Sequence, residues 1–131
     1  MKLRKAFTLI ELLVVVAIIG ILITIAVPRF QSMTAGARKN AALANKREIV
    51  SAVSMYIAAN NGLLPTDKTD LNSYLPVNPN DSTEAGIDYL KDQPQGAEYS
   101  FGTGTDTTTN TPYVIIKVTL DGDLLDSWQS N

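Results

Sequence analysis

A long apolar run near the N-terminus constrains this chain more than any other feature. The 21 residues from Phe7 to Val27 are apolar except for two threonines, one glycine and one glutamate. As an α-helix they would extend about 31 Å at 1.5 Å per residue, which matches a hydrocarbon core of about 30 Å. Three bases lie in residues 1–6. The positive-inside rule therefore predicts a cytoplasmic N-terminus and a translocated remainder.

Glu11 is the exceptional residue in this run, because a carboxylate inside an apolar span is costly unless it lies near the end of the span. Two interpretations are open. Glu11 lies close enough to the interface to be tolerated, or it pairs with a buried cation. No lysine, arginine or histidine lies between Phe7 and Val27. A cationic partner would therefore be a new N-terminal amine, made by cleavage just before Phe7, of the same chain or of a neighbouring subunit.

The segment Lys5–Leu22, KAFTLIELLVVVAIIGIL, resembles the class III signal of type IV pilins and related pseudopilins. The shared features are a short basic leader, a cleavage site before phenylalanine, a glutamate at the fifth place after the cut, and a proline, Pro28, that ends the span. The resemblance covers residues 1–30 and is much weaker in the rest of the chain. Membership of this family is therefore predicted from the N-terminal quarter.

This resemblance implies that a prepilin peptidase cleaves between Ala6 and Phe7 and that the new Phe7 amine is N-methylated. It also implies that Glu11 docks each subunit into a growing filament by pairing with the Phe7 amine of a neighbour. A buried carboxylate that faces a buried ammonium neutralises two costly charges and fixes the axial register. Ala6 stands where the family usually has glycine, which predicts slower or less complete processing.

Gly20 and Pro28 predict an irregular helix. Pro28 has no backbone donor and clashes with the carbonyl of Thr24, so a kink is expected there. Filaments of the resembled family are similar in letting the helix between such a glycine and proline lose its regularity on assembly. The alternative is that Gly20 is a small packing residue and that Pro28 marks the end of the span.

Residues 29–60 continue the helical pattern. Apolar residues recur at spacings of three, four and seven on one face; they are Leu43, Val50, Val53 and Ile57, with Ile49 and Tyr56 alongside. The sequence Asn60-Asn61-Gly62 predicts the stop, since asparagine and glycine readily adopt the left-handed conformation at a helix end. One continuous helix of about 50 residues is predicted, with an apolar first half and an amphipathic second half.

Charge is segregated along the chain. Residues 29–59 carry a net charge of +4 and residues 60–131 a net charge of −8. The basic face of this helix consists of Arg38, Lys39, Lys46 and Arg47. Spaced bases can bind phosphates without sequence preference, but the acidic heads of neighbouring subunits offer ready counter-charges. We therefore interpret this face as a solvated one and do not expect nucleic acid as a partner.

The remainder is predicted to form a small head. Residues 61–97 form the connection, with a short helix near residues 70–75 and a second one that follows the capping-box spacing Asp81–Glu84. Residues 98–131 form an antiparallel sheet, whose clearest strand is 113–120 with Val114, Ile116, Val118 and Leu120 on one face. Trp128 is expected to cover an edge of the core.

The predicted fold class is therefore α+β and type IV pilin-like. A long N-terminal helix has a protruding apolar half and an amphipathic half packed on a small antiparallel head. The predicted organisation is a leader at 1–6, a transmembrane or filament-core helix at 7–28, and a head at 29–131.

The composition excludes most catalytic chemistry. The chain has no cysteine and no histidine, so disulfides, thiolate sites and the commonest general base and zinc ligand are absent. An enzyme is not expected, and neither is a cofactor. Asp121, Asp123 and Asp126 are weak candidates for a calcium site, since hard cations prefer clustered carboxylates. The Asp121-Gly122 turn alone suffices to explain these residues, and this explanation is favoured.

The predicted function is that of a structural subunit of a type IV pilus, which polymerises through its N-terminal helix into a surface filament for adhesion, twitching motility or related surface functions. The expected partners are other copies of the chain, a prepilin peptidase, and the assembly platform and ATPase. The precursor would wait in the cytoplasmic membrane. Alternatives are a pseudopilin of type II secretion or a competence pilin, and more remotely a secreted binding domain cut after Ala26.

Overall fold

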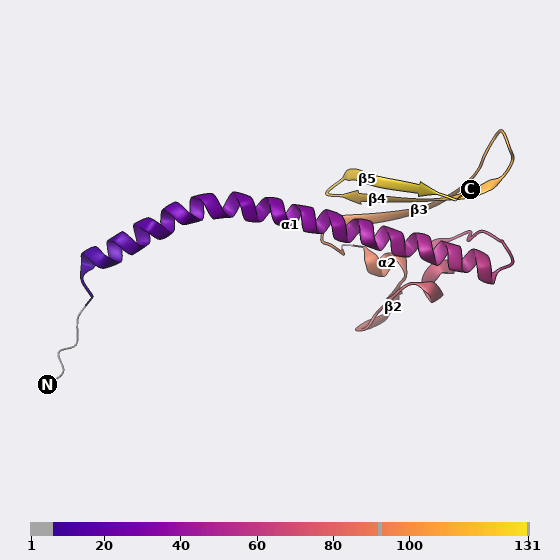
Figure 1. Ribbon diagram of the computed structural model, residues 1–131. Helices are drawn as coiled ribbons and strands as arrows, with labels where there is room; N and C mark the ends of the chain where they lie inside the picture. Colours follow the sequence, from indigo (N-terminus) through magenta and orange to yellow (C-terminus); the bar gives the residue numbers. More distant parts are fainter. Residues whose placement is uncertain (1–6, 92, 131) are drawn as a thin grey trace. The chain divides into compact units, whose positions relative to one another are not determined.

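The computed structural model describes residues 7–91 and 93–130, with the backbone alone for residues 82–84. The chain divides into two compact units, Met1–Gly36 and Ala37–Asn131, which are described separately. One helix, α1 (Leu9–Ala59), runs through both (Figure 1). It remains helical through Gly20 and Pro28. The loss of regularity expected between these residues on assembly stays a prediction for the assembled state.

In the first unit, every described side chain is exposed, from Phe7 to Gly36. Its first part is a single helical stretch that is long and apolar enough to cross a membrane. So much unpartnered apolar surface is not stable in water and requires lipid or other helices around it. The predicted apolar half of the helix is confirmed in length and composition.

In the second unit, α1 packs one face on the head. The buried residues of this face are Ala42, Lys46, Ile49, Ala52 and Val53. Leu43 and Val50 of the predicted stripe are only half-buried at its flank. The helix ends as predicted, because Asn61 and Gly62 have positive φ angles of 55° and 87°, and the Gly62 N–H donates to the Ile57 carbonyl at 2.9 Å.

The sheet of the head is antiparallel, in the order β3-β4-β5. The strands are β3 (Ala97–Thr105), β4 (Pro112–Leu120) and β5 (Asp123–Gln129). β3 and β4 pair without interruption from Ala97↔Leu120 to Thr105↔Pro112, whereas β4 and β5 shift register after Val118. The predicted antiparallel sheet and the inward face of its central strand are confirmed.

The connection between helix and sheet holds four short elements. They are η1 (Lys68–Tyr74), β1 (Val77–Asn78), β2 (Asp81–Ala85) and α2 (Ile87–Leu90). The short helix expected near residues 70–75 corresponds to η1. The helix expected directly after the Asp81–Glu84 spacing is wrong at its start, because residues 81–85 pair with β1 as a strand and a helix begins only at Ile87.

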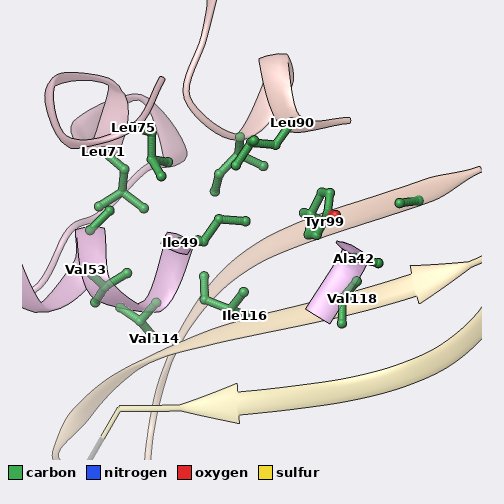
Figure 2. Packing of buried hydrophobic residues seen from close by; sticks show 13 residues of the cluster. Ala42, Ile49, Val53, Leu71, Leu75, Leu90, Tyr99, Val114, Ile116 and Val118 are labelled. Carbon is green, nitrogen blue, oxygen red and sulfur yellow. The ribbon is translucent and has the colours of Figure 1, made fainter. Parts of the chain in front are cut away.

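The core of the head lies where these elements meet α1. Figure 2 shows Ile49 and Val53 of α1 among Leu71 and Leu90 on one side and Ile116 on the other. Three side chains on the inward face of β4 are completely inaccessible to solvent, those of Val114, Ile116 and Val118, whereas Leu120 on the same face is half-buried. Tyr56 and Tyr74 meet edge to face, with ring centroids 6.2 Å apart. Trp128 is half-buried against this core, as predicted.

Candidate functional site

The candidate site begins at the first turn of α1, where Thr8 and Glu11 form a reciprocal cap. The Thr8 N–H and the Thr8 hydroxyl donate to Glu11 Oε2 at 2.9 and 2.8 Å, and the Glu11 N–H donates to Thr8 Oγ1 at 3.3 Å. This is the capping box, in which the residue before the helix and the third helical residue satisfy each other's backbone donors. The carboxylate of Glu11 is therefore held at the positive end of the helix dipole.

Among the described residues, one oxygen of this carboxylate accepts hydrogen bonds. Within residues 7–91 and 93–130, both recorded hydrogen bonds to the Glu11 side chain end on Oε2. Phe7 lies directly before the cap and is 77% exposed. Ala6, the other residue of the predicted cleavage site, is outside the described residues. A capped Glu11 therefore keeps an oxygen that can accept a further donor, such as an ammonium.

Thr8 is a residue that the sequence reasoning missed. The signal was present, since Thr8-Leu9-Ile10-Glu11 has the capping-box spacing immediately before an apolar helix. The same spacing occurs at Asp81–Glu84, where the chain forms a strand instead. A second capping box does exist in the head, between Asp67 and Asp70 at the start of η1.

Farther along the apolar part of α1, the three residues Gly20, Thr24 and Pro28 follow one another at intervals of four. The Thr24 hydroxyl donates to the Gly20 carbonyl oxygen at 2.9 Å. Pro28 lies inside the helix and supplies no N–H to the carbonyl of Thr24. The two residues expected to weaken the helix are thus linked through a third, Thr24.

The basic face of α1 is not simply a solvated face, which corrects the interpretation of its charges. Arg38 Nη2 contacts Asp121 Oδ1 at 3.0 Å and also donates to the Gln95 carbonyl. Lys46 Nζ contacts Asp126 Oδ2 at 2.6 Å. The Lys46 side chain is only 10% exposed, whereas that of Asp126 is 51% exposed. Two of the four bases therefore pair within their own head.

These pairs also occupy two of the three calcium candidates. Asp121 is held by Arg38 and Asp126 by Lys46, while Asp123 is exposed beyond the turn. Among the described residues, no group of three or more acidic side chains lies close enough to hold a metal ion. The structure thus gives the carboxylates of Asp121 and Asp126 a different role, which is to fasten the β5 region to α1.

The segment before β3 is held in place by three residues that the sequence analysis does not identify, Asn45, Tyr99 and Gly96. The Gln93 carbonyl accepts hydrogen bonds from the Asn45 side chain and from the Tyr99 hydroxyl, the latter at 2.9 Å. Gly96 has a φ of +81°, and a side chain there would meet the Asp121 carboxylate and the Arg38 guanidinium. Glycine is therefore required where this segment passes under the Arg38–Asp121 pair.

The Lys46–Asp126 pair predicts a pH dependence of head stability. The Lys46 ammonium lowers the pKa of Asp126, and the Ser127 N–H adds to this effect. Asp126 thus stays charged in the folded head at a pH where the unfolded chain binds a proton. Its contribution is complete above the unfolded pKa of about 3.9 and is lost as pH falls through the lower folded value.

In denaturant titrations between about pH 5 and pH 2, the Lys46→Met variant should therefore lose less stability than the wild-type protein. Asp123→Asn, which removes a neighbouring carboxylate without touching the pair, should keep the wild-type slope. An equally steep fall in Lys46→Met would contradict the assignment.

The fold and the N-terminal site together define a class of protein. Its members combine an α+β head with a long N-terminal helix, and the apolar part of that helix carries a capped glutamate. Comparison with known proteins narrows this class. The prokaryotic N-terminal methylation motif matches residues 1–27. The predicted relationship to the type IV pilin family is confirmed by this match and by the relatives of the chain.

Three relatives illustrate that relationship. Type IV major pilin protein PilE of Neisseria gonorrhoeae is 45% identical over 67 residues, which are 51% of this chain and 40% of the relative. A fimbrial protein of Neisseria meningitidis serogroup A is 43% identical over 67 residues, 51% of this chain and 39% of the relative. A fimbrial protein of Pseudomonas aeruginosa is 66% identical over 35 residues, 27% of this chain and 23% of the relative.

The similarity is thus partial. The chain matches about two fifths of the length of its Neisseria relatives and less of the Pseudomonas one. No solved structure matches the chain significantly.

Proposed function

We propose that this chain is a structural subunit of a type IV pilus, and that it polymerises through its N-terminal helix into a surface filament. One observation carries the proposal: the first part of α1 exposes a long, largely apolar surface whose N-terminal turn presents the Glu11 carboxylate. The methylation motif and the names of the relatives support it. No catalytic activity is proposed.

The proposed path has two stages. The precursor is held in the cytoplasmic membrane by α1, and a prepilin peptidase removes residues 1–6 and leaves Phe7 as an N-methylated terminus. A separate ATP-driven machine then moves the subunit from lipid into a filament, where neighbouring helices replace lipid around the apolar surface. The Phe7 ammonium of one subunit pairs with Glu11 of the next, so that two charges costly in isolation are neutralised together.

An intact-mass and N-terminal fragment spectrum of protein sheared from cells tests this path. The expected chain begins at Phe7 and carries one extra methyl group. The same chain should be enriched in purified surface filaments, which separates a pilus subunit from a pseudopilin that stays within a secretion system. A chain that begins at Val27 would indicate ordinary secretion and would refute the proposal.

A further inference from the structure

The C-terminal end of α1 is followed by a chemically reactive dipeptide, Asn61-Gly62. It is the only place in the sequence where glycine follows asparagine. Both residues are exposed, and a Cβ built on Gly62 would have no non-neighbouring heavy atom within 4 Å. In such a pair the backbone nitrogen of the glycine can approach the side-chain amide carbon of the asparagine, because glycine has no side chain that blocks the approach. The pair has the chemistry required for deamidation.

The two asparagines at this helix end differ in the freedom of their side chains. Asn60 is half-buried, and its side-chain amide donates to the Tyr56 carbonyl at 2.9 Å. Asn61 is exposed, and among the described residues its side chain has no hydrogen-bond partner. Its amide carbon is therefore free to turn toward the Gly62 nitrogen.

The backbone of the helix end opposes the reaction. The Gly62 N–H donates to the Ile57 carbonyl at 2.9 Å, and the Leu63 N–H donates to the Asn60 carbonyl at 3.1 Å. The Gly62 nitrogen must lose its proton before it can attack, and a proton held in a hydrogen bond is harder to remove. Hydrogen bonds at the end of a helix open at a lower cost than those of the core. The reaction is therefore expected from the opened helix end.

We propose that Asn61 is a site of spontaneous deamidation and that the hydrogen-bonded C-terminal cap of α1 controls its rate. The deprotonated Gly62 nitrogen forms a bond to the side-chain carbonyl carbon of Asn61. The bond from that carbon to the amide nitrogen breaks, and this nitrogen leaves as ammonia with the proton that Gly62 lost. A five-membered succinimide ring remains, and water opens it at either carbonyl to give aspartate or isoaspartate. Water is the only co-reactant.

Either product weakens the end of the helix. Both replace a neutral amide by a carboxylate at the negative end of the helix dipole, where an anion is unfavourable. In isoaspartate the backbone also runs through the side-chain carbon, which displaces the Gly62 N–H from the Ile57 carbonyl. The segment that follows packs on the head, since Leu64 is half-buried and Pro65 is fully buried. A weakened cap should therefore lower the stability of the head.

Peptide mapping by mass spectrometry tests the site, with a fragmentation method that distinguishes isoaspartate from aspartate. The full chain is incubated in detergent micelles at neutral pH. Asn61 should be converted before any other asparagine. Asn110 is the internal control, because it is also exposed and has a left-handed φ of 56°, but threonine follows it. If Asn61 is converted no faster than Asn110, the proposed site is wrong.

The same incubation in denaturant tests the role of the cap. Asn61 should react about 5–30-fold faster in the unfolded chain than in the folded one, the ratio expected when a helix end must first open. A free peptide that contains Asn-Gly, added to both solutions, corrects for the effect of the denaturant on the chemistry itself. Equal corrected rates would overturn the role of the cap.

Asn61→Gly is the matched variant, because glycine is favourable in the left-handed cap and has no side-chain amide. After incubation the wild-type head should unfold at a lower denaturant concentration than before, as followed by the fluorescence of the half-buried Trp128. Asn61→Gly should be unchanged. Equal losses in both proteins would overturn the effect on the head.

The proposal concerns the head and is independent of the proposed pilin function. None of these measurements requires cleavage before Phe7 or polymerisation. Failure of the deamidation experiment would leave the pilin proposal standing. A chain found to begin at Val27 would overturn the pilin proposal and leave the reactive site in place.

Discussion

Replacement of Glu11 by alanine is expected to lower the yield of assembled filaments at least about tenfold, while a processed protein accumulates in the membrane. In the proposed filament the Phe7 ammonium is enclosed among apolar helices, and Glu11 is its counter-charge. Without that carboxylate the ammonium is buried unpaired, which costs more than the pair itself contributes. Membrane insertion should be intact, because alanine makes the span more apolar.

The capping box makes a sharper test available, because Glu11 has a local partner as well as a proposed distant one. If Glu11 acts only as a helix cap, Thr8→Val should impair assembly comparably to Glu11→Ala. Thr8→Val removes the two hydrogen bonds of the Thr8 hydroxyl, and Glu11→Ala removes the two bonds to the carboxylate. If Glu11 acts as a counter-charge, Thr8→Val should retain most of the filament yield. Glu11→Gln should assemble as poorly as Glu11→Ala.

The measurement is the amount of the chain in sheared filaments relative to the amount in membranes, with an N-terminal mass spectrum to confirm processing in each variant. Normal filament yield from Glu11→Ala would refute the docking role. Equal losses in Thr8→Val and Glu11→Ala would assign Glu11 to the cap instead.

Structural features that depend only on neighbouring residues could be predicted from the sequence. The alternation in β4 places Val114, Ile116, Val118 and Leu120 on one face; the first three are completely buried and Leu120 is half-buried. Strand alternation depends only on the period of two residues and therefore does not require knowledge of the partner. The helix stop at Asn60-Asn61-Gly62 could be predicted for the same reason, since asparagine and glycine favour a left-handed backbone wherever they occur.

Features set by distant residues could not be predicted. Ala42 and Ala52 are at the centre of the buried face of α1, although alanine gives little hydrophobic signal and the predicted stripe favoured Leu43 and Val50. Small residues are buried where another element approaches closely, and only the fold defines that place.

The charges of the helix show the same limit. The pairing of Lys46 with Asp126 joins residues 80 positions apart, and nothing local indicates it. A run of bases on a helix therefore does not reveal which of them are already neutralised within the head. Whether Lys46 is neutralised depends on the register of β5, because this strand brings Asp126 to the buried ammonium.

Capping-box spacing lies between these two cases. The spacing is present at Thr8–Glu11 and at Asp81–Glu84, but only the first begins a helix. At residues 81–85 strand pairing with Val77–Asn78 takes precedence over the local preference. A spacing motif thus identifies a favourable helix start, and the pairing available to the segment decides whether a helix forms.

A substitution in the interior of the head is also expected to have a large effect, on the stability of the head. Ile49 is completely buried on α1, and Figure 2 shows its side chain between the segment of Leu71 and Leu90 and the strand of Ile116. It therefore contributes to both layers that pack on the helix. Ile49→Ala removes apolar contacts with both and leaves a cavity that neither layer can fill without moving away from the other. We expect a loss of about 2–5 kcal/mol in the free energy of unfolding of the head.

Trp128 offers a direct readout, because it is the only tryptophan and is half-buried against this core. Its fluorescence can follow unfolding in denaturant with the full chain in detergent. Ile25→Ala is the matched control, as the same substitution in the same helix at a side chain that is 58% exposed. It should leave the transition of the head unchanged, since Ile25 is exposed and belongs to the other unit of the chain, outside the core of the head. If the unfolding transition of Ile49→Ala is no different from that of Ile25→Ala, the two-layered core is contradicted. A helix that packed on the sheet alone would lose one set of contacts and could move toward the sheet to fill the cavity.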